Sequence, residues 1–558
     1  MPLSPAPSRV NRQFTDRESF IEAFDETLAA VDPARYDVLV YYGVGGIGKT
    51  ALRKHLGNHL DAQQDPARWA TVNFELAANR NPDNALFLAR NALQRKYKFR
   101  FPSFDLAYAV YWERTHPQIP LARKELPFLQ EGDLLSDVIL AVKDVPGLGL
   151  VTRLPKAVAK LGGAAQRWWT RRGRADLQEL ASLDDGEILD RLSRFWAGDL
   201  ADALAVTGER VVLFLDTYEA LWEGKRLEHL RFSLDEWVRQ WILHLPGVLW
   251  VIAGREKLHW EEWNAEWAQH LHQHLVGKLA DEDARRFLLT AGVHDEAVAD
   301  AIIEGAEGVP FYLDVALDTF SQITAQRTPT PDDFARAPRK VIDRFLKYLD
   351  RPERETLNVL SAARAWDRAL FEQLVTAFQT GYPPTALPEL RRFSFIEDVD
   401  VEGEDAGPRW TMHALMRRGL QEHWAEENVA AVHQHLFDHY TATLENLDHR
   451  TLDETQRSAL GEAFYHGRHV LEPEAFIAWF RQADDAFQQG AQWRLLIPLQ
   501  EELAGVVEAA YGAEHEQTAS ALHNLADLYY QQANYEQAEP LYQRSLTIKE
   551  QALGPDHP

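Results

Sequence analysis

The stretch YYGVGGIGKT, residues 41–50, places four glycines directly before Lys49 and Thr50. It continues the apolar run YDVLVYYG, and the residues that follow, KTALRKHLGNHL, have the spacing of a helix. Glycines let successive backbone N–H groups turn inward around a phosphate, and the next helix directs its positive end toward the same anion. A glycine-rich loop between a strand and a helix therefore predicts a phosphate site.

Each residue of this loop has an expected role. Lys49 would reach the β- and γ-phosphates of a nucleotide, and Thr50 would coordinate Mg²⁺. The alternative is a glycine-rich turn with an incidental lysine, which the preceding strand and following helix disfavour. The residues expected to hold the nucleotide here are Gly43, Gly45, Gly46, Ile47, Gly48, Lys49, Thr50 and Ala51.

Three further apolar runs have the length and composition of buried parallel strands. They are WATVNF (69–74), RVVLFLD (210–216) and GVLWVIAG (247–254), each bounded by helix-like or turn-like sequence. Strands that alternate with helices predict a doubly wound α/β domain with a parallel sheet.

Three charged residues lie where these strands end. Ligands bind at the carboxyl edge of such sheets, so Asp216 would hold Mg²⁺, alternatively capping its strand. Glu219 would orient or deprotonate the attacking water, and its alternative is a solvated helix position. Arg255 would sense a γ-phosphate through its planar donor fork, unless it is a surface arginine.

The composition limits the classes of function. The chain has 558 residues, 46% of them hydrophobic, and 59 Lys and Arg against 85 Asp and Glu give a formal charge of −26. Such an acidic chain repels nucleic acid unless one face is locally basic, so nucleic acid is an unlikely partner. The absence of cysteine, of a signal peptide and of a long apolar segment predicts a cytoplasmic protein.

The pattern changes several times along the chain, which predicts a multidomain α/β and α protein. The expected parts are a flexible tail (1–12), a P-loop nucleotide-binding domain (13–280) with a basic helical insertion at about 80–205, a helical domain (281–340), a winged-helix domain (341–425), a helical linker or solenoid start (426–510) and a repeat of the tetratricopeptide type (511–558).

The C-terminal part repeats. YGAEHEQ (511–517) resembles LGPDHP (553–558), and the sequence between them has the pattern of two amphipathic helices. Small residues, Ala526 and Ala538, stand where these helices would meet. The pattern resembles a tetratricopeptide repeat of the longer, kinesin-light-chain type. Because the chain stops where another unit would begin, we expect a truncated array or one that continues in the native protein.

The order of the motifs resembles the STAND class of P-loop ATPases, in its NB-ARC branch. The glycine-rich loop, the strand with Asp216, the strand ending in Gly-Arg, then EGVPFYL and TMHALMRRG follow one another as in that class, over roughly residues 12–425. The resemblance implies a closed, ADP-bound monomer that opens on exchange for ATP and then oligomerises. It also implies slow ATP hydrolysis, with ATP or ADP and Mg²⁺ as cofactors.

The resemblance assigns roles to residues outside the loop. It implies that Phe14 and Arg17, in FTDR, contact adenine and ribose. It implies that Gly308 and Pro310 form a turn that packs against the base, and that His413, after Met412, touches the β-phosphate of ADP and latches the winged helix. The chain departs from the pattern at Thr217, where a second acid is common, and at Ala414, where an aspartate is common.

The function expected from these features is an ATP/ADP-dependent signalling switch in bacterial regulation or defence. Its partners would be adenine nucleotide, further copies of the chain, and a protein or peptide trigger on the repeat tail. The alternatives are a nucleotide-stabilised scaffold, a winged-helix transcriptional regulator and a motor, which the repeat tail and the acidic surface disfavour. The basic segment at 130–175 suits a membrane interface or a nucleic-acid contact, although a packed helical layer or an oligomer interface is favoured. HLHQH (270–274) is expected on an amphipathic, solvent-facing helix, with no metal-ligand spacing.

Overall fold

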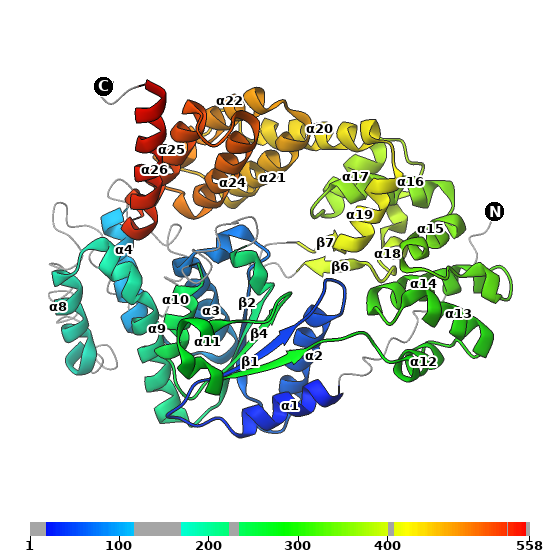
Figure 1. The fold of residues 1–558 in the computed structure, drawn as a ribbon, viewed down its shortest axis with the longest axis horizontal. Helices are drawn as coiled ribbons and strands as arrows, with labels where there is room; N and C mark the ends of the chain where they lie inside the picture. The colour runs from blue at the N-terminus through cyan, green and yellow to red at the C-terminus, as the bar shows by residue number, and fades with distance from the viewer. Residues whose placement is uncertain (1–17, 116–168, 223–233, 400–406, 533, 554–558) are drawn as a thin grey trace.

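The structure is a computed structural model that describes residues 18–115, 169–222, 234–399, 407–532 and 534–553 (Figure 1). Several expectations fall outside these residues. They concern the tail at 1–12, the adenine-contacting Phe14 and Arg17, most of the basic segment at 130–175 and the acidic turn between the two strands of the expected winged helix.

A five-stranded parallel sheet forms the centre of the N-terminal part, in the order β2-β3-β4-β1-β5. All four strands that the apolar runs predicted are present, and β4 lies between the strand before the glycine-rich loop and the strand that ends in Asp216. The strands are β1 (Asp37–Tyr42), β2 (Arg68–Asn73), β3 (Val211–Asp216), β4 (Leu249–Gly254) and β5 (Leu271–Leu275).

Helices cover both faces of this sheet. Successive side chains of each strand point to opposite faces and so enter two different cores. Leu39 and Tyr41 of β1 pack with α1 (Glu18–Ala29) and α2 (Lys49–Ala62). Val38 and Val40 point to the opposite face, which belongs to a larger core. That core includes α3 (Pro82–Tyr97), α4 (Pro102–Thr115), α9 (Asp185–Thr207), α10 (Glu236–Leu243) and α11 (Trp260–Trp263).

The prediction of a helix at HLHQH was wrong. Residues 271–274 belong to β5, which pairs in parallel with β1 at the edge of the sheet, with Val38 opposite Leu271. Only one neighbouring strand covers β5, so His272 stays exposed, and polar residues are tolerated there. Gln273 fixes the strand by exchanging two hydrogen bonds of 2.9 Å with the backbone of Leu258.

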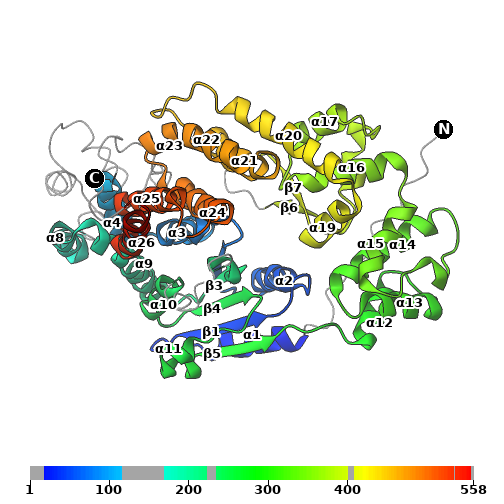
Figure 2. The same ribbon diagram turned by 45° about the horizontal axis from the view of Figure 1, so that its top comes forward.

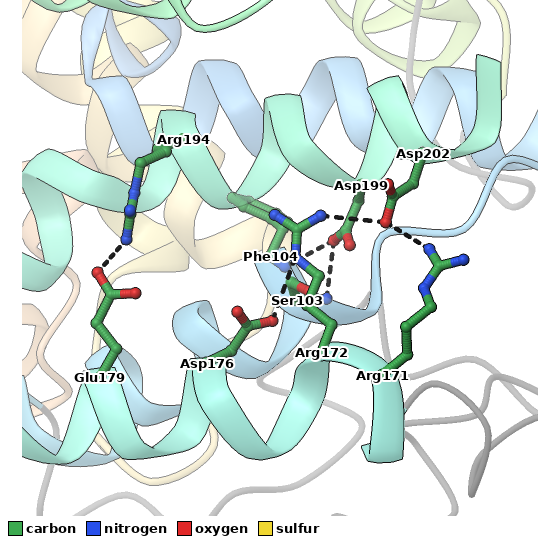
Figure 3. A network of polar contacts seen from close by, with 9 residues as sticks. All are labelled: Ser103, Phe104, Arg171, Arg172, Asp176, Glu179, Arg194, Asp199 and Asp202. Carbon is green, nitrogen blue, oxygen red and sulfur yellow. Dashed lines mark hydrogen bonds and ion pairs between the residues drawn. The ribbon is translucent and has the colours of Figure 1, made fainter. Parts of the chain in front are cut away.

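The described end of the basic insertion is a packed helical layer with internal ion pairs (Figure 3). Arg171 and Arg172 precede α8 (Arg174–Ser182), and both contact Asp202 of α9, at 2.6 and 3.1 Å. A Cβ at Gly198 would collide with the Arg172 guanidinium, so the glycine makes room for it. Both arginines thus form ion pairs within this layer, while the Arg171 side chain stays 66% exposed.

A buried carboxylate joins α9 to α4. Asp199 accepts the backbone N–H groups of Ser103 and Phe104 at 2.8 and 2.9 Å, as Figure 3 shows. These are orphan donors at the first turn of α4, so the contact caps that helix from another element. Burial raises the pKa of Asp199.

A second core extends from Leu279 to Leu436 and holds the helices that follow the sheet. Within it, β6 and β7 pair antiparallel, and helices precede β6 and follow β7, while residues 400–406 between the strands lie outside the described residues. We call residues 351–423 the β6–β7 unit. The elements are α12 (Asp281–Thr290), α13 (Glu296–Ala306), α14 (Pro310–Thr324), α15 (Pro338–Tyr348), α16 (Arg351–Ala362), α17 (Arg368–Ala377), β6 (Ile396–Val399), β7 (Arg409–Met412) and α19 (Ala414–His423).

The C-terminal helices form a solenoid that curves back toward the N-terminal part (Figures 1 and 2). Ala526 and Ala538 are buried between the last two helices, as the repeat pattern predicted. The helices are α20 (Glu426–Thr443), α21 (Glu454–Val470), α22 (Pro473–Ala483), α24 (Trp493–Tyr511), α25 (Glu516–Gln531) and α26 (Tyr535–Leu553).

Candidate nucleotide-binding site

The glycine-rich loop connects the carboxyl end of β1 to the first turn of α2. Gly46 and Gly48 have φ angles of +78° and +90°, which side chains other than glycine rarely adopt. A Cβ at Gly43 would lie 2.5 Å from the Val276 carbonyl oxygen, so only glycine fits there. Lys49 Nζ donates to the Gly43 and Val44 carbonyl oxygens at 2.6 and 3.0 Å. The Lys49 side chain therefore folds back over the loop, and its ammonium group is held by two carbonyl oxygens of the loop.

Charged groups gather around Lys49. Burial lowers the pKa of its ammonium, Glu219 and Asp216 raise it, and Arg255 lowers it. The structure thus brings together the groups that end β3 and β4 with the lysine that follows β1. They meet at the carboxyl edge of the sheet, where doubly wound folds bind their ligands.

Two oxygen ligands suitable for Mg²⁺ face each other beside the loop. Thr50 Oγ1 lies 3.4 Å from Asp216 Oδ1, and the aspartate side chain is only 3% exposed. A hydroxyl and a carboxylate are hard oxygen donors, which fit Mg²⁺ completed by phosphates and water. Thr217 has a φ of +57°, a strained value for a β-branched residue, and its N–H donates to Asp216 Oδ1 at 2.9 Å. No cluster of three or more His, Asp or Glu able to hold a metal occurs among the described residues.

The two groups expected to act in hydrolysis contact each other. Arg255 Nε lies 3.0 Å from Glu219 Oε1, and the Arg255 N–H donates to Oε2 at 3.1 Å. The arginine side chain is 54% exposed and the glutamate 11%. In this arrangement the Glu219 carboxylate is occupied by Arg255, so water activation requires the pair to rearrange.

The first turns of α14 and α19 cover the glycine-rich loop. A Cβ built at Gly46 would lie 2.6 Å from Leu415 Cδ1 and 3.6 Å from Phe311 Cβ, and one at Gly48 would lie 4.0 Å from Pro310 Cγ. The Phe311 ring stacks on the His413 ring, with centroids 4.4 Å apart. Three helix N-termini, those of α2, α14 and α19, therefore converge on the loop, which favours an anion. We call Pro310, Phe311, His413 and Leu415 the lid contacts.

His413 is prepared to donate a hydrogen bond. Its Nδ1 accepts the Leu415 N–H at 3.3 Å as the N-cap of α19, which assigns the proton of the neutral ring to Nε2. Burial, together with nearby Arg417, lowers the pKa of His413 to about 4. At neutral pH the imidazole is therefore an uncharged donor, suited to a phosphate oxygen.

The turn before α14 is held against the chain that leaves β5. Gly308 has a φ of +72°, and a Cβ there would lie 2.5 Å from the Leu279 carbonyl oxygen. The Leu279 N–H donates to the Gly308 carbonyl at 2.7 Å. These contacts explain why glycine precedes Val309 and Pro310 in EGVPFYL.

Several residues at this site were not singled out from the sequence. Arg53 of α2 contacts Asp216, with Nε and Oδ2 3.4 Å apart. Glu397 of β6 lies near enough to be influenced by charges of this region. Burial raises the pKa of its carboxyl group, Lys54 lowers it, and Glu75 and Asp216 raise it. Phe311 and Leu415 directly neighbour predicted residues, but an apolar residue beside Pro310 or His413 carries no signal of its own.

Comparisons with known proteins bear on parts of the chain. Residues 518–558 match the tetratricopeptide repeat family, which confirms the repeat in the tail. A search among curated proteins returned no match. No helix among the described residues has the length and hydropathy needed to cross a membrane.

Solved structures resemble the chain only distantly. One is a signal transduction ATPase with numerous domains (STAND) protein with a tetratricopeptide repeat sensor from Pyrococcus horikoshii, with 13% identity over 99% of this chain and 67% of that chain and a TM-score of 0.41. The ORC2 protein from Aeropyrum pernix has 12% identity over 75% of this chain and 96% of that chain, with a TM-score of 0.31. ORC from Drosophila, bound to DNA, has 13% identity over 74% and 88%, with a TM-score of 0.29. Likeness at this level says nothing about function.

Proposed function

We propose that the protein is an ATP/ADP-dependent switch of the STAND class, held closed by ADP through the β6–β7 unit, which acts as its winged-helix domain. The observation that carries this proposal is that the lid contacts cover the glycine-rich loop. Leu415 and His413 come from the β6–β7 unit, and Phe311 comes from the helical part before it. Leu415 and Phe311 lie against Gly46, and the His413 ring stacks on Phe311. A ligand in the loop therefore acts on the contact between two parts of the molecule.

The nucleotide would set the balance between closed and open forms by binding them unequally, since a ligand that binds both equally shifts nothing. ADP would gain a hydrogen bond from the neutral His413 only while the lid contacts persist. A third phosphate adds volume and negative charge beneath Leu415 and Phe311, which already lie close to the loop. We expect ATP to favour the open form and self-association to follow from surfaces that opening exposes.

The repeat tail would sense the trigger. Tetratricopeptide arrays present extended surfaces to other proteins, so a protein or peptide is the expected trigger. The tail also contacts the insertion of the nucleotide-binding part through Tyr111, whose hydroxyl donates to the Gln532 carbonyl at 2.7 Å. A trigger that binds the tail can thus compete with a contact made inside the closed molecule.

Hydrolysis is expected to be slow. Glu219, the candidate base, is held in an ion pair by Arg255, so each turnover must first break that ion pair. The same observation favours the second candidate function, a scaffold that binds nucleotide for stability with little turnover. The two candidates differ in whether assembly depends on which nucleotide is bound.

The test is the identity of the bound nucleotide together with the size of the particle. Protein purified without added nucleotide is denatured and its nucleotide identified by chromatography, and its mass is measured by light scattering with ADP and with a non-hydrolysable ATP analogue. The switch predicts bound ADP, a monomer with ADP and a larger assembly with the analogue, while Lys49→Ala binds neither. Nucleotide binding with the same mass in both states supports the scaffold, and no adenine nucleotide under any condition overturns both.

A further inference from the structure

The carboxylate expected to hold Mg²⁺ already has a cation beside it. Arg53 follows Lys49 and Thr50 by one helical turn on α2, and its Nε lies 3.4 Å from Asp216 Oδ2. The other carboxylate oxygen faces Thr50 and accepts the Thr217 N–H. One oxygen thus faces Thr50, the other residue expected to hold Mg²⁺, and the other oxygen faces a guanidinium group.

Burial makes this pairing consequential. The side chains of Asp216 and Arg53 are 3% and 11% exposed, so little water screens either charge. A buried carboxylate without a counter-charge is strongly disfavoured. In P-loop enzymes the divalent cation supplies that positive charge when it binds with the nucleotide. A guanidinium group stays charged at all accessible pH values. Asp216 therefore keeps a counter-charge whether or not metal is bound.

We propose that Arg53 is a built-in counterion of Asp216 that makes nucleotide binding at this site only weakly dependent on Mg²⁺. The inference rests on the proposed nucleotide site. With the guanidinium in place, the aspartate does not repel a metal-free diphosphate, and it attracts Mg²⁺ less. Closed protein would thus retain ADP while Mg²⁺ leaves.

The neighbouring lysine provides a matched control. Lys54 follows Arg53 on the same helix and carries the same charge, but it acts on Glu397 of the β6–β7 unit. Removing its charge changes the net charge of α2 equally without touching Asp216. A general electrostatic effect would therefore appear in both variants, whereas the counterion effect appears only at Arg53.

The experiment measures the dissociation constant of fluorescently labelled ADP in excess EDTA and in excess Mg²⁺. The quantity compared among variants is the constant in EDTA divided by the constant in Mg²⁺. For wild type we expect a ratio within a few-fold of one. Arg53→Met should raise the ratio by about tenfold or more, because ADP without metal then faces a buried carboxylate that has lost its arginine ion pair. Arg53→Lys should restore much of the wild-type ratio, and Lys54→Met should leave it unchanged.

A second readout needs no nucleotide. Mg²⁺ alone should raise the thermal unfolding temperature of Arg53→Met more than that of wild type, because Asp216 lacks its counterion there. In an Asp216→Asn background, Arg53→Met should no longer change the ADP ratio. This comparison keeps the proposal testable if Arg53→Met alone folds poorly.

The outcomes separate the inference from the function on which it rests. A ratio for Arg53→Met equal to that of wild type overturns the counterion role. So does an equal loss of ADP affinity with and without Mg²⁺, which makes Arg53 a direct nucleotide contact. A wild-type chain that binds no ADP in either condition contradicts the nucleotide site itself.

Discussion

At the scale of single residues, His413 is the side chain that would connect the lid contacts to a bound nucleotide in the proposed switch. Its Nδ1 is engaged by the Leu415 N–H and its ring by Phe311, so Nε2 is the nitrogen assigned to a ligand. Since burial keeps the ring neutral, it donates without adding a charge that would also attract a third phosphate. In the proposed switch the residue would therefore act through the direction of one hydrogen bond rather than through net charge.

We predict that His413→Ala releases ADP about ten to a hundred times faster than wild type, because a hydrogen bond to a charged phosphate contributes about 1.5–3 kcal/mol. Stopped-flow displacement of labelled ADP measures the rate. His423→Ala is the control, since His423 lies on the same helix and pairs with Asp343 at the surface. Equal release rates in wild type and His413→Ala would show that the imidazole does not hold ADP.

The sequence predicts some of these residues and not others, for a physical reason. Lys49, Thr50 and Asp216 follow from local patterns, because a loop and a strand end define their own surroundings. Arg53 and Leu415 become part of the site only through contacts with residues far along the chain. An arginine on a helix and a leucine after a histidine fit many environments, so tertiary packing alone gives them a role.

At the scale of elements, the strands that are buried were predicted from the sequence, and the exposed edge strand β5 was not. The strands β1, β3 and β4 are almost fully buried and were predicted from continuous apolar runs. The edge strand β5 has neither property, and a five-residue run of His, Leu and Gln has no reliable period. The pairing of β5 with β1 is set by the chain on either side, which sequence reasoning did not place.

The helices α20 and α21 share a buried histidine pair, which predicts a pH dependence. His433 Nδ1 lies 2.8 Å from His466 Nδ1, and burial with nearby positive charge holds the pKa of both rings well below 6.5. The unfolded chain therefore binds more protons, so stability is complete above pH 6.5 and falls as the pH drops below it. The charged and titratable groups around the pair are His469, Arg468, Arg364, Arg417, Glu462, Tyr440 and Tyr465.

We expect α20 and α21 to lose protection from hydrogen exchange between pH 6.5 and 4.5, by about 1.4 kcal/mol per pH unit for each proton taken up. His433→Gln should reduce this slope by about one proton. The exposed His294→Gln is the control and should leave the slope unchanged. Exchange measured across this pH range tests the prediction, and a slope unaffected by His433→Gln would assign the acid sensitivity elsewhere.

At the scale of the whole molecule, the tail closes onto the nucleotide-binding part. Figures 1 and 2 both show α26 beside α4, and the hydrogen bond from Tyr111 to the Gln532 carbonyl is buried. Burial and nearby Asp185 and Asp184 raise the pKa of Tyr535, so the start of α26 also lies close to α9. These contacts place the tail against the insertion.

We predict that Tyr111→Phe weakens this contact by about 1–3 kcal/mol, because the Gln532 carbonyl stays buried without a donor. Hydrogen exchange in α25 and α26 of the ADP-bound protein should increase. The control is Tyr382→Phe, whose hydroxyl donates to the Ala386 carbonyl within the β6–β7 unit. Unchanged exchange in the tail of Tyr111→Phe would mean that other contacts hold it.

The distance between the nucleotide-binding part and the β6–β7 unit tests the central claim most directly. The chain has no cysteine, so spin labels can be placed at Asn58→Cys on α2 and Arg418→Cys on α19, both exposed. Pulsed electron paramagnetic resonance should give one short distance between the two labels with ADP. A longer population should appear with a non-hydrolysable ATP analogue and grow in Tyr111→Phe. Identical distances with ADP and the analogue, in both backgrounds, would contradict a lid that responds to the nucleotide.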